Sequence, residues 1–112
     1  MIVVTSEYIA GKKVTKTLGL VRGNTIRARH IGKDIMAGLR ALVGGEIHEY
    51  AKLIAESREQ SLHRMIAHAD SLGANAIIAT RFTTSVMMGG AAELLAIGTA
   101  VIVEDTSVNN TE

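Results

Sequence analysis

The four histidines, His30, His48, His63 and His68, are the residues best suited to bind a metal ion. A zinc site on one helix face needs ligands spaced i,i+4, and no two of these histidines have that spacing or form an HExxH motif. Glu59 and His63 do have it, but a surface contact between them is favoured over ligation. The spacing therefore predicts no histidine metal site within a single chain. In a ring, however, one histidine from each subunit can converge on an axis.

Sulfur ligands are limited to methionine because the chain contains no cysteine, which also excludes disulfides and cysteine nucleophiles. Met87 and Met88 are soft donors that suit copper(I), but adjacent residues of an extended segment point in opposite directions. Flexible packing at a subunit contact is their favoured role. A divalent or soft metal ion thus stays open as a cofactor, with no ligands assigned.

A basic cluster leads into the first predicted helix, with Arg27, Arg29 and His30 at its centre and Arg22 and Lys33 beside them. Arginines next to the amides of a helix start can hold a small anion, a phosphate ester or an acidic partner. No glycine-rich phosphate loop accompanies the cluster, so a solvated or inter-subunit ion-pair surface is favoured. Arg27, Arg29 and His30 are therefore ligand or interface candidates.

Three further charges are unexpected at their positions: Arg58 on the long predicted helix, Arg81 inside an apolar strand, and Glu93 at the start of the last strand. Buried charges are usually paired, so these residues are candidates for an interface network or a pocket wall. The first candidate pair is Arg81 with Glu93, reached diagonally across a hairpin or from a neighbouring subunit.

Catalytic motifs are missing from the sequence. Its serines have no nucleophile-elbow motif around them, and its paired glycines show neither GxGxxG nor a following Lys-Ser/Thr. We therefore predict that the protein is not an enzyme.

The composition is that of one globular domain, predicted over residues 1–105 with a polar tail at 106–112. The chain has 112 residues, 47% of them hydrophobic, and a formal net charge of +1. Neither this charge nor an aromatic content of 3% suits nucleic-acid binding. No apolar run approaches the length of a membrane span, and no secretory leader is visible. A soluble cytoplasmic protein without membrane or nucleic-acid partners is expected.

The hydrophobic periodicity predicts an α+β fold in which two helices pack on one face of an antiparallel sheet. The expected helices cover residues 31–43 and 46–72, the second ending at Leu72-Gly73. The expected strands cover residues 2–4, 13–28, 76–86 and 94–103, and residues 87–92 join the last two as a hairpin. On the strand at 76–86, Ala76, Ile78, Phe82 and Val86 are expected to share one face.

Two features predict a ring-like homo-oligomer. The second helix would be about 40 Å long, whereas a compact chain of this size has a radius of gyration of ~13 Å. The last strand is apolar on both faces, with Leu95, Ile97, Val101 and Val103 opposite Leu94, Ala96, Ala100 and Ile102. Because one layer of helices covers one face, a neighbouring subunit is expected to cover the other. Ser57, Arg58 and Ser61 form a polar spot on the packing face of the long helix.

Several segments, in their order and spacing, resemble the YbjQ-like family of uncharacterised proteins labelled as heavy-metal-binding. These segments are Gly23-Asn24-Thr25-Ile26 with the predicted helix from Ile31 to Leu42, Leu42-Val43-Gly44-Gly45-Glu46 with Tyr50, Leu72-Gly73-Ala74-Asn75-Ala76-Ile77, and Gly98-Thr99-Ala100-Val101. The resemblance implies a small α+β subunit in a ring, favouring a pentamer, and it assigns no metal ligands and no activity. The function expected is that of a homo-oligomeric binding or scaffold protein, with a metal ion or small ligand at subunit interfaces left open. An adaptor module for a protein partner and an enzyme with an interface-built active site are the alternatives.

Overall fold

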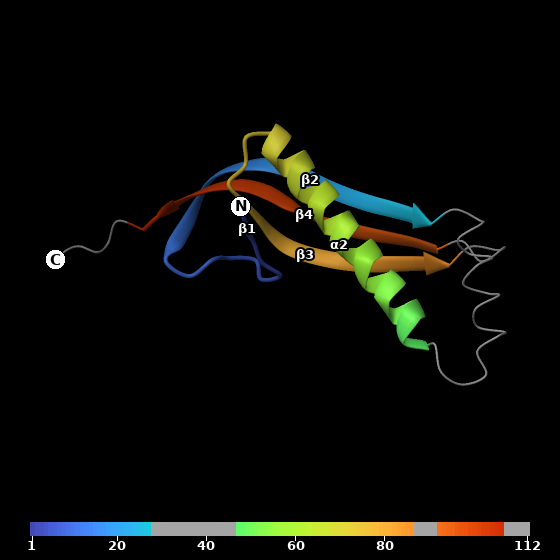
Figure 1. Cartoon of the computed structure of the whole chain (residues 1–112). Coiled ribbons are helices and arrows are strands. Elements are labelled where there is room, and N and C mark those ends of the chain that lie inside the picture. The colour runs from blue at the N-terminus through green and yellow to red at the C-terminus, as the bar shows by residue number, and fades with distance from the viewer. Residues whose placement is uncertain (28–46, 87–91, 107–112) are drawn as a thin grey trace.

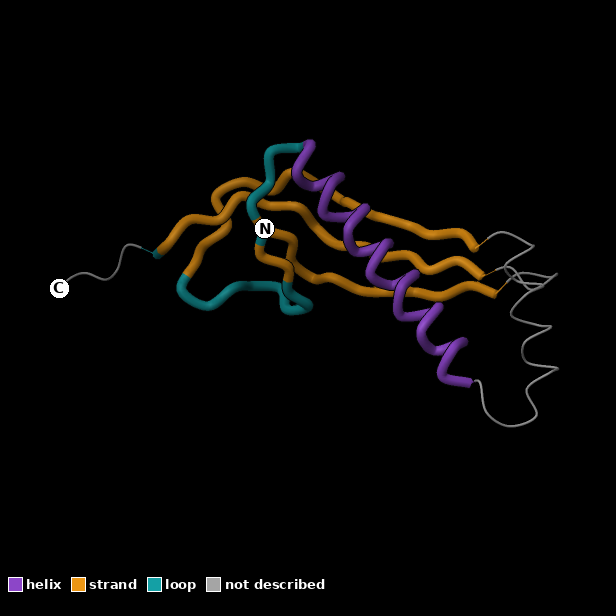
Figure 2. The backbone as a smooth tube through the Cα atoms, viewed as in Figure 1, coloured by secondary structure: helices purple, strands orange, loops and turns teal. Residues whose placement is uncertain are grey.

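The computed structural model describes residues 1–27, 47–86 and 92–106, and within them it forms one sheet with a helix across it (Figure 1). The strands are β1 (Ile2–Val3), β2 (Lys12–Arg27), β3 (Ala76–Val86) and β4 (Ala92–Asp105), and the helix is α2 (Ile47–Ser71). The strand order is β1-β3-β4-β2. Figure 2 shows α2 running diagonally over one face of the sheet. The α+β class and the long helix are confirmed, while the helix predicted at residues 31–43 lies outside the described residues.

The sheet is mixed, so the prediction of a wholly antiparallel sheet was wrong. β3 pairs antiparallel with β4, and β4 with β2, as the hairpin pattern indicates. β1, however, pairs in parallel with β3, with Ile2 beside Ala76 and Val3 beside Ile77. The chain then crosses to the opposite edge of the sheet to form β2, an arrangement that the apolar pattern of a short strand cannot specify.

The C-terminus of α2 closes with a Schellman motif. Gly73 has a φ of +86°, a conformation that glycine adopts at little cost. The Gly73 amide donates to the Asp70 carbonyl at 3.0 Å, and the Ala74 amide donates to the Ala69 carbonyl at 3.1 Å. Ala69 and Ala74 also lie in the same apolar cluster, which supplies the hydrophobic contact usual in this motif. The predicted helix end at Leu72-Gly73 is confirmed.

A β-bulge reverses the side-chain alternation of β3. The register with β4 shifts between Ile78 and Arg81, and Ala79 has a φ of +55°. Ile78 packs with the cluster on the face away from α2. Phe82 lies directly opposite Ala96, a residue of the α2-side cluster, and so shares its face. The prediction that Ile78 and Phe82 share one face was wrong, because the bulge inserts one extra residue between them.

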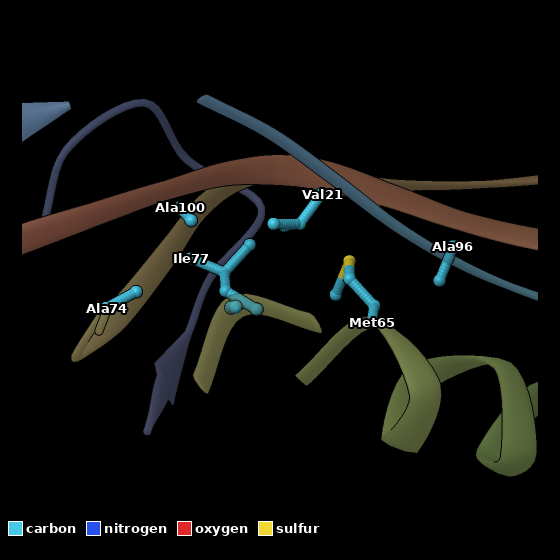
Figure 3. Packing of buried hydrophobic residues seen from close by; sticks show 7 residues of the cluster. Val21, Met65, Ala74, Ile77, Ala96 and Ala100 are labelled. Atoms are coloured by element: carbon cyan, nitrogen blue, oxygen red, sulfur yellow. The ribbon is translucent and has the colours of Figure 1, made fainter. Parts of the chain in front are cut away.

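Apolar residues lie on both faces of β4, as predicted. On the α2 side, Val21, Met65, Ile77, Ala96 and Ala100 are buried together (Figure 3). On the other side, which we call the far face, Val101, Val103 and Ala76 form a second cluster against Ile9 and Ile78. The chain is elongated, with a Cα radius of gyration of 18.4 Å, well above the ~13 Å of a compact chain of this length.

Candidate functional site

α2 approaches the sheet closely at Gly23. A Cβ atom built on Gly23 would lie 2.2 Å from both the Met65 nitrogen and the Ser61 carbonyl oxygen. Ser57 and Ser61, facing this contact, are almost wholly buried. The Ser61 hydroxyl donates to the Arg58 carbonyl at 2.9 Å. The two serines of the predicted polar spot are therefore small side chains that permit close packing, whereas Arg58 is exposed and does not belong to the packing face.

A buried hydroxyl lies beside the bulge. Thr80 is 3% exposed, and among the residues that the structure describes its Oγ1 is the buried side-chain atom without a hydrogen-bond partner. It faces Gly98 on β4, whose built Cβ would be 3.3 Å from this oxygen. Thr25 is equally buried, but its hydroxyl donates to the Ser57 carbonyl at 2.9 Å. The two threonines form a matched pair.

We expect Thr80→Val to stabilise the protein by about 1 kcal/mol, because the substitution removes an unsatisfied polar group and conserves the shape of the side chain. Thr25→Val should instead destabilise it by about 1 kcal/mol, since a made hydrogen bond is lost and the Ser57 carbonyl loses a donor. Urea unfolding at one protein concentration measures both changes. Equal effects of the two substitutions would contradict this assignment of the hydroxyls.

Arg81 is engaged by backbone oxygens and not by Glu93. Its Nη1 donates to the Thr5 carbonyl at 2.7 Å and to the Thr80 carbonyl at 2.8 Å. The sheet register places Arg81 opposite Ile97, four residues along β4 from Glu93, a separation of roughly 13 Å. Arg81 thus holds the segment after β1 against β3. The predicted contact between Arg81 and Glu93 was wrong within one chain.

Glu93 and Arg58 are placed apart from this contact. The Glu93 Oε2 accepts a hydrogen bond from the Asn24 side-chain amide at 3.2 Å, and Glu93 is half-buried. Arg58 is exposed on α2. Arg27 ends β2 opposite Ala92, and its side chain is not described. Arg29 and His30 lie outside the described residues, so the predicted basic cluster stays a prediction.

The far face carries an apolar centre flanked by arginines, which the sequence did not reveal. Residues directly opposite each other in antiparallel strands share a face, so Arg22 on β2 and Arg81 on β3 lie on either side of Ile97. Both arginines are exposed. Leu20, two residues before Arg22 on β2 and on the same face, is 58% exposed. Only the strand register, which joins segments far apart in the sequence, assembles this row.

Two side chains of α2 reach the outer edge of β2. The Arg22 backbone amide donates to Nδ1 of His68 at 3.3 Å. Nη1 of Arg64 donates to the Asn24 carbonyl at 2.6 Å. These backbone groups point away from β4 at the free edge of the sheet. Because Nδ1 of His68 accepts a hydrogen bond, it is not available to a metal ion while that bond persists.

The residues with described positions contain no group of three or more His, Cys, Asp or Glu side chains that could hold a metal ion.

An exposed ion pair joins the start of β2 to the end of β4, with Nζ of Lys12 at 2.5 Å from Oδ1 of Asp105. This hydrogen bond and the charge of Lys12 lower the pKa of Asp105.

In the part of the chain described, no helix is both long and apolar enough to cross a membrane.

Comparison of the sequence with known proteins places this chain in a family. A family profile described as "Putative heavy-metal-binding" matches residues 1–104. A UPF0145 protein of Methanosarcina acetivorans is 56% identical over 101 residues, covering 90% of this chain and 95% of the relative. One from Dehalococcoides mccartyi is 59% identical over 104 residues, covering 93% of this chain and 100% of the relative.

A solved structure supports the fold. The crystal structure of a protein of unknown function from Pediococcus pentosaceus, assigned to the DUF74 family, matches with a TM-score of 0.61 at 15% sequence identity. The match covers 93% of this chain and 98% of that one. At this identity it shows the fold alone. The profile match and the close relatives together show that the chain belongs to the YbjQ-like family of UPF0145 proteins.

Proposed function

We propose that this protein is a homo-oligomeric binding or scaffold protein whose copies close into a ring through the far face of the sheet. The observation that carries the proposal is the exposed apolar surface of that face, where Leu20 is 58% exposed and Ile97 and Leu95 are half-buried. Large apolar side chains gathered on one face are typical of an interaction surface.

The arrangement of the two faces supports a ring over a symmetric dimer. Within residues 1–27, 47–86 and 92–106, α2 covers one face of the sheet, and the far face is covered at one end by Ile9. If the outer side of α2 in one copy packs on the far face of the next, each copy uses two different surfaces. Such heterologous contacts give rings when the rotation closes. The family resemblance favours five copies.

The interface is also where we place any ligand. The family description supports a metal ion, and the described residues of one chain hold no group of three or more suitable ligands, so we propose ligands contributed by more than one copy. Arg22 and Arg81 offer cationic groups for an anionic ligand on the same face. The proposal includes no catalytic step, because Ser57 and Ser61 are buried packing residues. We further propose a cytoplasmic location and no nucleic-acid partner.

Native mass spectrometry of the purified protein from a volatile buffer tests this proposal. We expect a single oligomer of five subunits, and a bound metal ion or metabolite would add a defined excess mass per ring. A monomer mass across micromolar dilution would overturn the assembly. If a monomer instead co-purifies with one stoichiometric protein, the adaptor function replaces the scaffold function.

We expect zinc and copper(I) to bind weakly at best. The chain lacks thiolates, and an affinity in the micromolar range corresponds to about −8 kcal/mol, short of the ~10–16 kcal/mol typical of structural zinc in finger peptides. Isothermal titration of metal-free protein measures the affinity and the stoichiometry. A nanomolar site with one metal per subunit would contradict this expectation and identify the oligomer as a metal-binding protein.

A further inference from the structure

The free edge of β2 is closed by two side chains of α2 that lie one helical turn apart. His68 accepts from the outward amide of Arg22 at 3.3 Å, and Arg64 donates to the outward carbonyl of Asn24 at 2.6 Å. We call this pair the edge guard. Unpaired groups at a sheet edge are a template for pairing with another strand, and proteins often cover such edges. The edge guard occupies one outward donor and one outward acceptor of β2.

The two contacts differ in their response to pH. The hydrogen bond from the Arg64 guanidinium to the Asn24 carbonyl does not involve the imidazole, so protonation of His68 leaves its donor and acceptor unchanged. His68 can accept from Arg22 only when Nδ1 carries no proton, which requires the neutral imidazole with its hydrogen on Nε2. A protonated His68 would present an N–H donor to another N–H donor. The contact is then lost.

Among the residues that the structure describes, no acidic side chain is placed to compensate a positive charge on His68. On its side of α2 the charged neighbour is Arg64, one turn earlier, which is cationic. Asp70, two residues later, lies on the opposite side of the helix. The Arg22 side chain lies on the far face, so β2 offers His68 only its backbone amide there. β4 presents Ala96, Gly98 and Ala100 to the helix side of the sheet. Protonation therefore breaks the contact without creating an ion pair to a described residue.

We propose that the edge guard is a pH-sensitive device in which neutral His68 closes the free edge of β2 and protonated His68 opens it at Arg22. The proposal does not depend on the ring, since it rests on contacts within one chain. The edge is closed while His68 is neutral and opens at Arg22 when a fall in pH protonates the imidazole. An opened edge gains an outward amide that a second strand can use.

Residue-resolved amide hydrogen exchange of the whole protein tests this device. Exchange rates at pH 7.5 and 5.0 are converted to protection factors, which removes the intrinsic pH dependence of exchange. In the unmodified protein we expect the protection of the Arg22 amide to fall about fivefold at the lower pH, the loss that one ordinary hydrogen bond gives. The Ala100 amide, on the central strand β4, is the internal reference and should not change.

Two variants separate protonation from a general loosening of the helix. His68→Asn keeps an acceptor near the position of Nδ1 but cannot be protonated, so the protection of Arg22 should be the same at both pH values. His68→Leu removes the acceptor, so the protection should be low at both. Equal protection at the two pH values in the unmodified protein would overturn the proposal, as would a fall in His68→Asn as large as that in the unmodified protein.

Discussion

Replacing Gly23 by alanine is expected to destabilise the protein by about 3 kcal/mol or more, the upper range for overpacking a core. The added Cβ would lie 2.2 Å from two backbone atoms of α2, the nitrogen of Met65 and the carbonyl oxygen of Ser61. A clashing side chain can change rotamer, but a helix backbone can only move as a body. The substitution therefore lifts α2 from the sheet and opens the cluster around Met65 and Val21.

Gly19→Ala, on the same strand, is the matched control. Nothing lies within 4 Å of a Cβ built on Gly19, but its φ is +121°, so alanine is strained there without a clash. We expect a cost of about 1 kcal/mol from this backbone strain. Urea unfolding followed by circular dichroism, at one protein concentration, compares the two variants. If Gly23→Ala costs no more than Gly19→Ala, the close approach of α2 at Gly23 is wrong.

Features determined by local sequence were predictable. The long helix, its end at Gly73 and the apolar residues on both faces of β4 all follow from side-chain periodicity and from the conformational freedom of glycine. The pairing of β3 with β4 follows from their closeness in the chain. The family resemblance, which rests on short segments in a fixed order, was also correct.

Features determined by contacts between distant segments were not predictable. The parallel pairing of β1 with β3 joins residues more than seventy positions apart. The bulge at Ala79 moves Phe82 to the α2 side, and no proline or glycine marks it in the sequence. The role of Ser57 and Ser61 was hidden for the same reason, because it depends on Gly23 of a different strand.

The candidate site was predicted only as single charged residues. Arg81 was correctly placed within a strand, but the bulge and the hairpin register place it opposite Ile97 instead of near Glu93. Arg22 was predicted to belong to a basic cluster, yet its position in one row with Ile97 and Arg81 requires the registers of both β4 pairings. A one-residue difference in either register would have placed these side chains on opposite faces.

Ile97→Glu is expected to convert the proposed ring to folded monomers at micromolar concentration. Ile97 is half-buried at the centre of the far face. In a monomer, a carboxylate at this position is solvated and lies between the cross-strand neighbours Arg22 and Arg81, so the fold should tolerate it. In the ring the carboxylate and its arginine neighbours would be desolvated against the next copy, and removing an ion from water costs several kcal/mol. Every interface of the ring carries this cost.

The same substitution at Tyr8 is the matched control for this test. Tyr8 is a large side chain, 72% exposed, in the segment between β1 and β2, so Tyr8→Glu adds the same charge outside the row of Arg22, Ile97 and Arg81. Light scattering after size exclusion gives the mass of each variant, and circular dichroism confirms that each is folded. We expect Tyr8→Glu to keep the mass of the unmodified protein and Ile97→Glu to lose it. If folded Ile97→Glu keeps the full mass, copies do not pack on the far face, and the exposed row of Arg22, Ile97 and Arg81 is then a surface for a different partner.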